Sequence, residues 1–294
     1  MVKKATLIHL RIPFSFFLMP FFIFGISQLE EITWWKIGVA FIVVHFFHNG
    51  ASNAFNSYFD KDEGSIGGIE NPPPVDKELY VVSLVFDVLA IAIGYLVNPY
   101  FAIMVFIIGL ASKAYSHPMI RFKKYAVLGL LIVAFFQGFW TYFMVVVAQY
   151  GYSPSIFSQQ NLFAACICSL MLLGSYPMTQ IYQHEEDAKR GDQTFSLLLG
   201  VRGTFIWTMS IFTVASVLFI GYFVSYDSWF EVILFVVLTS PVVVYFLSWM
   251  KDSWQNESRA DYKSTMKLNM LSAICFNLFF AGLIVLKWSV ARGQ

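Results

Sequence analysis

Long runs of apolar residues recur along almost the whole chain, and they limit the possible folds more than any other feature. A helix needs about 20 mainly apolar residues to cross a bilayer. Here 58% of the residues are hydrophobic and only 13% are charged, whereas a soluble domain has roughly 25% charged residues. The runs are continuous and do not alternate as the strands of a membrane barrel do. We therefore predict an all-α, polytopic membrane protein.

We count nine runs and predict that each is one transmembrane helix of a single domain, residues 1–294. The longest uncharged stretch, from Tyr125 to His184, is divided into two spans by polar residues near Pro154 and Asn161. The predicted spans lie near 12–29, 37–59, 79–97, 99–120, 125–148, 161–183, 203–226, 232–250 and 268–287.

Lysine and arginine are distributed unevenly between the two sides of this arrangement. With nine spans, sixteen of them lie on the side of the N-terminus, and the other side holds Lys36, Lys287 and Arg292. Cytoplasmic loops of membrane proteins carry the excess of Lys and Arg. We therefore expect a multi-pass protein of the cell (inner) membrane with a cytoplasmic N-terminus. The net charge of +1 gives no indication of a nucleic-acid partner.

Two short polar segments, each at the end of an apolar run, indicate the chemistry. The first extends from Asn53 to Glu63 and the second from Gln180 to Gly191, and each contains a cluster of carboxylates. Both fall on the predicted cytoplasmic face. Magnesium prefers oxygen ligands and needs only one or two carboxylates when a substrate supplies phosphates. The two segments together therefore indicate a site for Mg²⁺ and a diphosphate at the membrane surface.

Polar residues near the end of the second run are three or four positions apart and share one helix face. Such residues are costly at membrane depth unless they face a cavity, although membrane helices also use them to join one another. We interpret His45 as a joining residue, and Asn56 and Asp60 as functional residues. The full stripe is His45, His48, Asn49, Ser52, Asn53, Asn56, Asp60 and Glu63.

The sixth run ends in a similar way, with Tyr176, Gln180, Gln183 and Asp187 at spacings of four, three and four. Pro177 removes a backbone donor, so we expect a kink near the cavity. The alternative interpretation is a solvated helix end with mixed charge.

Four segments follow one another at predicted helix ends: Arg11-Ile-Pro13, Asn56-Ser-Tyr-Phe-Asp60, Tyr115-Ser-His-Pro118 and Gln183-His-Glu-Glu-Asp187. Together they resemble the motifs of the UbiA superfamily of intramembrane prenyltransferases, and the resemblance covers nearly the whole chain. It implies a nine-helix bundle with a central cavity open to the cytoplasmic face. It also implies transfer of a prenyl group from a polyprenyl diphosphate to a hydrophobic aromatic or lipid acceptor within the lipid membrane, with Mg²⁺-assisted loss of pyrophosphate.

The resemblance also implies roles for individual residues. The expected catalytic residues are Asn56, Asp60 and Asp187. The expected Mg²⁺ ligands are Asp60, Asp62, Glu63, Glu186 and Asp187. The expected substrate-binding residues are Arg11, Asn53, Tyr115, Arg121, Lys123, Gln180, Gln183 and Lys189.

Gly64 and Gln183 stand where the family motifs have an aspartate. We hypothesise that Glu63 and Glu186 supply the missing oxygens. If they do not, the chain is a non-catalytic UbiA-like protein that binds isoprenoid lipid; a small-molecule transporter is a further alternative. The loop from Gly64 to Pro74 is either a lid or a plain connection.

Two expectations concern residues inside the spans. Asp87 lies within the third run and is either functional or else protonated or hydrogen-bonded to a neighbour. Aromatic side chains are expected to line a tunnel for the prenyl tail, and the candidates are Phe136, Phe139, Trp140 and Phe143.

Overall fold

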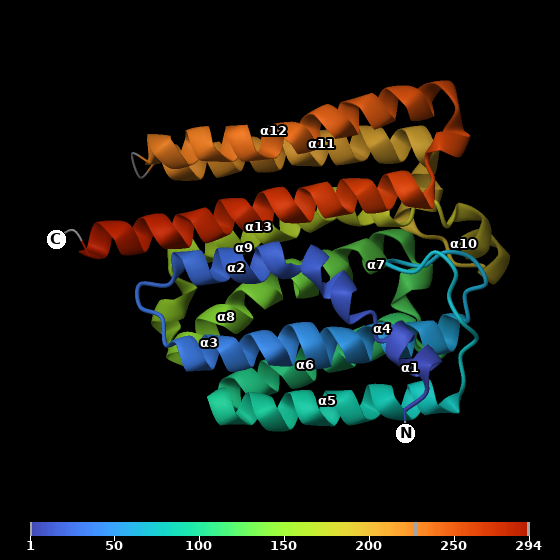
Figure 1. Ribbon diagram of the computed structural model, residues 1–294, viewed down its shortest axis with the longest axis horizontal. Helices are drawn as coiled ribbons and strands as arrows, with labels where there is room; N and C mark the ends of the chain where they lie inside the picture. The colour runs from blue at the N-terminus through green and yellow to red at the C-terminus, as the bar shows by residue number, and fades with distance from the viewer. Residues whose placement is uncertain (1, 226–227, 293–294) are drawn as a thin grey trace.

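The computed structural model describes residues 2–225 and 228–292, and its long segments are helices aligned along a common direction (Figure 1). The described part of the chain contains no β-strand, so the all-α prediction is confirmed. The longer helices are α2 (Met19–Gln28), α3 (Trp34–Phe41), α4 (Asn49–Asp60), α5 (Lys77–Val97), α6 (Pro99–Ser116), α7 (Ala126–Val133), α8 (Thr141–Tyr150), α9 (Gln159–Ser175), α11 (Phe195–Ser225), α12 (Trp229–Gln255) and α13 (Tyr262–Arg292).

Several short helices connect or extend the long ones. Two are π-helical segments, η2 and η4, which continue α3 into α4 and α7 into α8. Such segments are frequent at functional sites. The short elements used below are α1 (Lys4–His9), η1 (Ile12–Phe17), η2 (Ile42–His48), η3 (Phe122–Lys124), η4 (Ala134–Trp140), η6 (Tyr176–Thr179) and α10 (His184–Arg190).

The described helices account for seven or eight candidate membrane crossings. Within the described ranges, seven helices are long and apolar enough to cross a membrane, and an eighth results if the N-terminal pair, bent by 46° between Phe17 and Met19, is one span. The predicted span 37–59 is helical from Trp34 to Asp60, but its second half is too polar to pass the same test. Nine spans therefore remain a prediction. Position 226 of the predicted span 203–226 lies outside the described residues.

Aromatic side chains hold the centre of the bundle. The Phe24 ring on α2 lies 4.6 Å from that of Phe280 on α13, 5.3 Å from that of Phe219 on α11 and 5.8 Å from that of Tyr142 on α8. Offset and edge-on ring pairs at these distances are favourable. This cluster joins helices from the two halves of the sequence.

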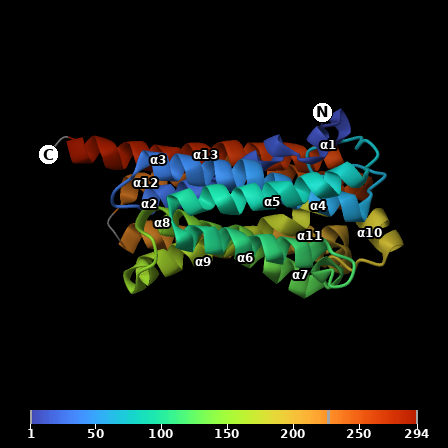
Figure 2. The same cartoon turned by 90° about the horizontal axis from the view of Figure 1, so that it is seen from below.

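The N-terminus, α1, the end of α4 and α10 all lie at one end of the bundle, and the C-terminal end of α13 lies at the other (Figures 1 and 2). Both acidic segments therefore lie at the end of the bundle that carries the N-terminus, as the sequence predicted.

Gly138 lies where η4 closely approaches α9. A Cβ atom at this position would lie 2.7 Å from the backbone nitrogen of Ser169 and 2.8 Å from the backbone of Cys168 on α9. Overpacking of this kind costs about 1–3 kcal/mol. We expect Gly138→Ala to lower the thermal unfolding midpoint of the purified protein in detergent. Gly38→Ala is the matched control, because a Cβ there meets no atom within 4 Å, and an unchanged midpoint for Gly138→Ala would contradict the close contact.

Candidate functional site

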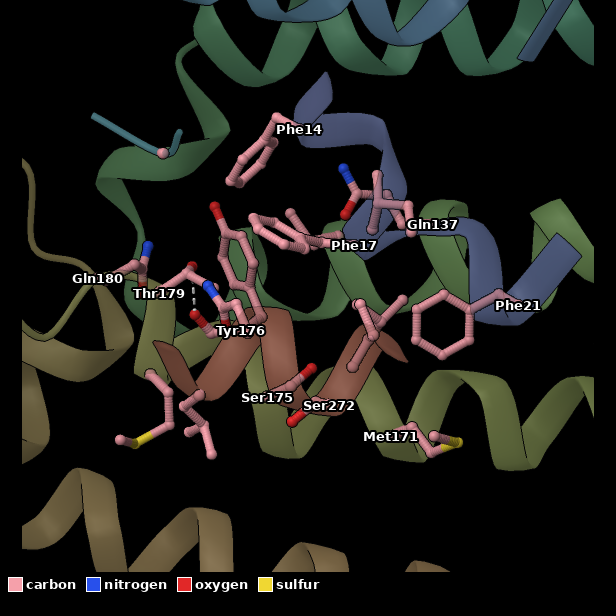
Figure 3. Close-up of a pocket in the computed structure, with 18 of the residues that line it drawn as sticks. Phe14, Phe17, Phe21, Gln137, Met171, Ser175, Tyr176, Thr179, Gln180 and Ser272 are labelled. Carbon is pink, nitrogen blue, oxygen red and sulfur yellow. Dashed lines mark hydrogen bonds between the residues drawn. The ribbon is translucent and has the colours of Figure 1, made fainter. Parts of the chain in front are cut away.

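A cavity of about 580 Å³ lies between the helices and reaches the end of the bundle that carries α10. Figure 3 shows Phe14, Phe17 and Phe21 on one side of it and Tyr176 and Met171 on the other. Most of its depth is lined by apolar and neutral polar side chains. The charged residues in its lining are Arg11, Asp60, Asp62, Lys123, Asp187 and Arg190.

The polar stripe of the second predicted span faces this cavity for most of its length. His48, Asn49, Ser52, Asn53, Asn56 and Asp60 line it. His45 does not; its Nδ1 lies 2.6 Å from the hydroxyl of Ser15 on η1, so it joins two helices as predicted. The Asn56 Oδ1 accepts a hydrogen bond of 2.7 Å from Ser116 on α6, which fixes the amide at the cavity wall.

The first acidic segment begins where α4 ends. Lys61 adopts a left-handed conformation with φ of 50° and turns the chain, so that Asp60 and Asp62 both line the cavity. The Asp60 side chain is only 3% exposed and forms ion pairs with Lys123 and, at 3.4 Å, with Arg121. A buried carboxylate requires such partners.

The second acidic segment enters the cavity through Asp187 on α10. Its Oδ2 accepts from the Thr194 hydroxyl at 3.1 Å, and its Oδ1 accepts from Arg190 at 3.1 Å. Burial raises the pKa of Asp187 to about 6, although Arg190 and Thr194 act in the opposite direction. The carboxyl group is therefore still mainly ionised at neutral pH.

Arg190 joins the two acidic segments directly. Its guanidinium donates to Asp187 on its own helix and to Asp62, which lies 128 residues away in the sequence. The two segments that the sequence marked separately thus meet at one place. Each of the three carboxylates that line the cavity is paired with a basic side chain that a phosphate could also engage.

Asp192 is a buried residue next to the site that sequence reasoning did not single out. It is 2% exposed, and both of its oxygens accept hydrogen bonds of 2.7 Å from Arg121. These bonds raise the pKa of Arg121, against the effect of burial. They also hold Arg121 outside the cavity lining, so it lies behind Asp60. Its signal in the sequence is indirect: the many basic residues predicted on this side of the membrane need acidic partners.

Other predicted binding residues lie where a substrate could reach them. Arg11 has a left-handed backbone with φ of 47°, and its guanidinium donates to the carbonyls of Gly67 (3.3 Å) and Asn53 (3.4 Å). Such conformations are uncommon outside glycine and cluster at functional sites. The Tyr115 hydroxyl lies 2.5 Å from that of Tyr176. All five of these residues line the cavity.

Gln180 and Gln183 also line the cavity. Gln180 is 8% exposed, and its buried Oε1 has no hydrogen-bond partner in the described chain. Leaving such an atom unpaired costs about 1–3 kcal/mol, and this oxygen is therefore free to accept a hydrogen bond or a metal within the cavity. The Gln183 Nε2 instead donates to the carbonyl of Ser65 at 3.1 Å.

Several predicted residues are not in the cavity lining. Glu63 and Lys189 are exposed, and the Glu186 carboxylate accepts from the backbone of Gly64. Asp87 forms a 2.7 Å ion pair with Lys113, so a neighbour neutralises it. Of the four aromatic residues proposed for a tunnel, Phe136 lines the cavity, while Phe139, Trp140 and Phe143 pack elsewhere.

No group of three carboxylate, histidine or cysteine side chains in the described residues forms a complete metal site. The carboxylates of Asp60, Asp62 and Asp187 and the unpaired Gln180 oxygen are nevertheless hard donors at one cavity mouth. Magnesium is commonly held by one or two carboxylates together with substrate phosphates. The donor set therefore fits Mg²⁺ that arrives with a phosphorylated substrate.

The fold and the site together define a helical membrane protein with a largely apolar cavity whose mouth carries both acidic and basic residues. The chain belongs to the UbiA prenyltransferase family, whose model matches residues 17–271. A search of curated protein sequences finds no match.

Solved structures with the same fold cover nearly the whole chain. A UbiA homologue from Archaeoglobus fulgidus, bound to DMAPP and Mg²⁺, is 15% identical, has a TM-score of 0.70, and aligns over 96% of this chain and 99% of its own. The apo form of a homologue from Aeropyrum pernix K1 is 17% identical, with a TM-score of 0.68 and coverage of 92% and 98%. A digeranylgeranylglyceryl phosphate synthase is 20% identical, with a TM-score of 0.60 and coverage of 96% and 98%. These similarities show the UbiA fold.

Proposed function

We propose that this protein transfers a prenyl group from a polyprenyl diphosphate to a hydrophobic acceptor within the membrane, with loss of pyrophosphate and with Mg²⁺ as cofactor. One observation carries the proposal. Two acidic segments, distant in the sequence, meet beside Lys123 and Arg190 at the mouth of a cavity whose depth is apolar. Homologues of this fold from A. fulgidus bind DMAPP or GPP together with Mg²⁺.

Asp60, Asp62 and Asp187 would hold the metal, with amide oxygens such as that of Gln180 as further donors. Bound Mg²⁺ supplies neutralisation of the charge that develops on the departing pyrophosphate. Lys123 and Arg190 can exchange a carboxylate partner for a phosphate oxygen, and Arg11 is suited to a forked phosphate contact.

The apolar part of the cavity is suited to the prenyl group and its transfer to the acceptor. The allylic carbon–oxygen bond breaks, its electron pair leaves with pyrophosphate, and the acceptor forms the new bond and loses a proton. Apolar walls around Phe14, Phe17 and Phe136 would hold the prenyl tail and exclude water that could capture the allylic cation.

We further propose that the cavity mouth faces the cytoplasm and that residues 1–294 act as one domain. The uneven distribution of Lys and Arg supports this orientation, because the mouth lies at the same end of the bundle as the N-terminus.

The test is pyrophosphate release by the purified protein from geranylgeranyl and farnesyl diphosphate, with and without Mg²⁺. We expect release that requires Mg²⁺. Absence of release with either diphosphate would contradict the proposed enzyme activity and favour a lipid-binding role.

If release is observed, a comparison of lipid extracts from a deletion strain and its parent would identify the acceptor.

A further inference from the structure

One face of α10 is directed at the loop that follows α4. Gln183, Glu186 and Arg190 are separated by three and four positions, so they lie on the same side of this segment. Their partners are consecutive parts of residues 62–65, which we call the 62–65 loop. These contacts join two segments that are 118 residues or more apart in the sequence.

Glu186 makes the central contact with the 62–65 loop. Its Oε1 accepts hydrogen bonds from the backbone N–H of Gly64 at 2.6 Å and of Glu63 at 3.2 Å. Bonds from backbone N–H groups to a carboxylate are stronger than neutral ones. The Gln183 side chain bonds the Ser65 carbonyl on one side, and Arg190 bonds the Asp62 carboxylate on the other.

Gly64 is required by space and not by its backbone conformation. It is not among the glycines with positive φ. A Cβ atom at this position would lie 3.0 Å from Glu186 Oε1 and 3.1 Å from Glu186 Cδ. A side chain at position 64 would therefore crowd the carboxylate, which would have to shift by a few tenths of an ångström from its place beside the two N–H groups. Gly64 and Glu186 fit each other as a pair.

We propose that Glu186 is a positioning residue that fixes the 62–65 loop against α10 and so keeps Asp62 at the cavity mouth. Its oxygen is already used by two backbone donors, and it is absent from the cavity lining. Asp62, by contrast, lines the cavity and has a side chain only 5% exposed. Glu186 thus acts on the metal through the loop and does not bind it.

This assignment differs from a metal-ligand role in a way that one substitution can separate. Glu186→Gln keeps an oxygen that accepts hydrogen bonds from Glu63 and Gly64 but removes the negative charge. Glu186→Ala removes both. A positioning role tolerates glutamine, whereas a ligand role needs the carboxylate.

The experiment measures amide hydrogen exchange of Glu63 and Gly64 in the purified protein without substrate. We expect Glu186→Ala to increase exchange at these two amides about 10-fold or more, because their acceptor is lost, and Glu186→Gln to change it less than about 3-fold. Gly64→Val should reproduce the alanine result with Glu186 intact. Glu185→Ala, a neighbouring exposed glutamate, is the control and should leave the exchange unchanged.

The second measurement is the Mg²⁺ concentration needed for half-maximal pyrophosphate release, which rests on the proposed function. We expect about a 5- to 10-fold increase for Glu186→Ala and less than about 2-fold for Glu186→Gln. Unchanged exchange in Glu186→Ala, or an equal loss of Mg²⁺ affinity in both variants, would overturn the positioning role. The exchange result needs no turnover, so failure of the proposed enzyme activity would be seen separately.

Discussion

Replacing Asp60 with asparagine is expected to reduce Mg²⁺-dependent pyrophosphate release about 10³-fold, equivalent to about 4 kcal/mol of transition-state stabilisation. Asp60 is buried, lines the cavity and lies beside Lys123, so asparagine at this position keeps the shape but removes the charge. Both the proposed metal and the balance of charge around the diphosphate depend on it. Asp187→Asn is expected to show a loss of similar size.

The comparison requires a variant at the same end of the molecule that lies outside the cavity. Asp76→Asn is suitable, because Asp76 pairs with Lys3 and accepts from the backbone N–H of Glu78 at the start of α5. Asparagine also accepts such a bond, so α5 should keep its cap. Release by Asp76→Asn should equal that of the unmodified protein. Equal release by Asp60→Asn would remove the main support for the proposed site.

Apolar run length predicted most of the fold, because each long run must become a helix to satisfy its backbone in lipid. It also predicted the helix near 37–59, which the structure has from Trp34 to Asp60, although the polar cavity face of this helix keeps it out of the seven spans that pass the hydropathy test. It did not predict the 46° bend between Phe17 and Met19, because run length does not record the direction of a helix.

The site was predicted where side chains repeat along a helix face. Asn53, Asn56 and Asp60 follow this rule, and all three line the cavity. The helix-face repeat does not apply beyond the helix ends, where the conformation of the loop sets the direction of each carboxylate. Glu63 is consequently exposed, and Glu186 bonds the backbone of the 62–65 loop.

The two departures from the family motifs are connected in the structure. Gly64 leaves room for the Glu186 carboxylate, and Gln183 donates to the carbonyl of Ser65 in the same loop. Both positions therefore contribute to the contact between α10 and the 62–65 loop. An aspartate at position 183 could not donate to the Ser65 carbonyl, and an aspartate at position 64 would crowd and repel the Glu186 carboxylate.

Lys123→Met is expected to lower pyrophosphate release about 10²-fold, mainly through weaker binding of the diphosphate. Lys123 is 8% exposed, lines the cavity and pairs with Asp60. Truncating one partner of a buried charge pair costs about 2–5 kcal/mol, but Arg121 remains 3.4 Å from Asp60 to compensate part of its charge. Lys124→Met is the neighbouring control, because the Lys124 ammonium lies over the Tyr125 ring and outside the cavity lining.

The role of Lys123 can be identified by comparing the change in KM for the diphosphate with the change in the Mg²⁺ concentration that the reaction requires. Removing a cation that competes for Asp60 should leave the requirement for Mg²⁺ unchanged or slightly lower, while KM for the diphosphate rises. Lys123→Arg keeps a positive charge and should recover part of the diphosphate affinity. If Lys123→Met raised the Mg²⁺ requirement as strongly as KM, Lys123 would act by holding Asp60 in place, and the phosphate contact would have to be assigned to Arg11 and Arg190.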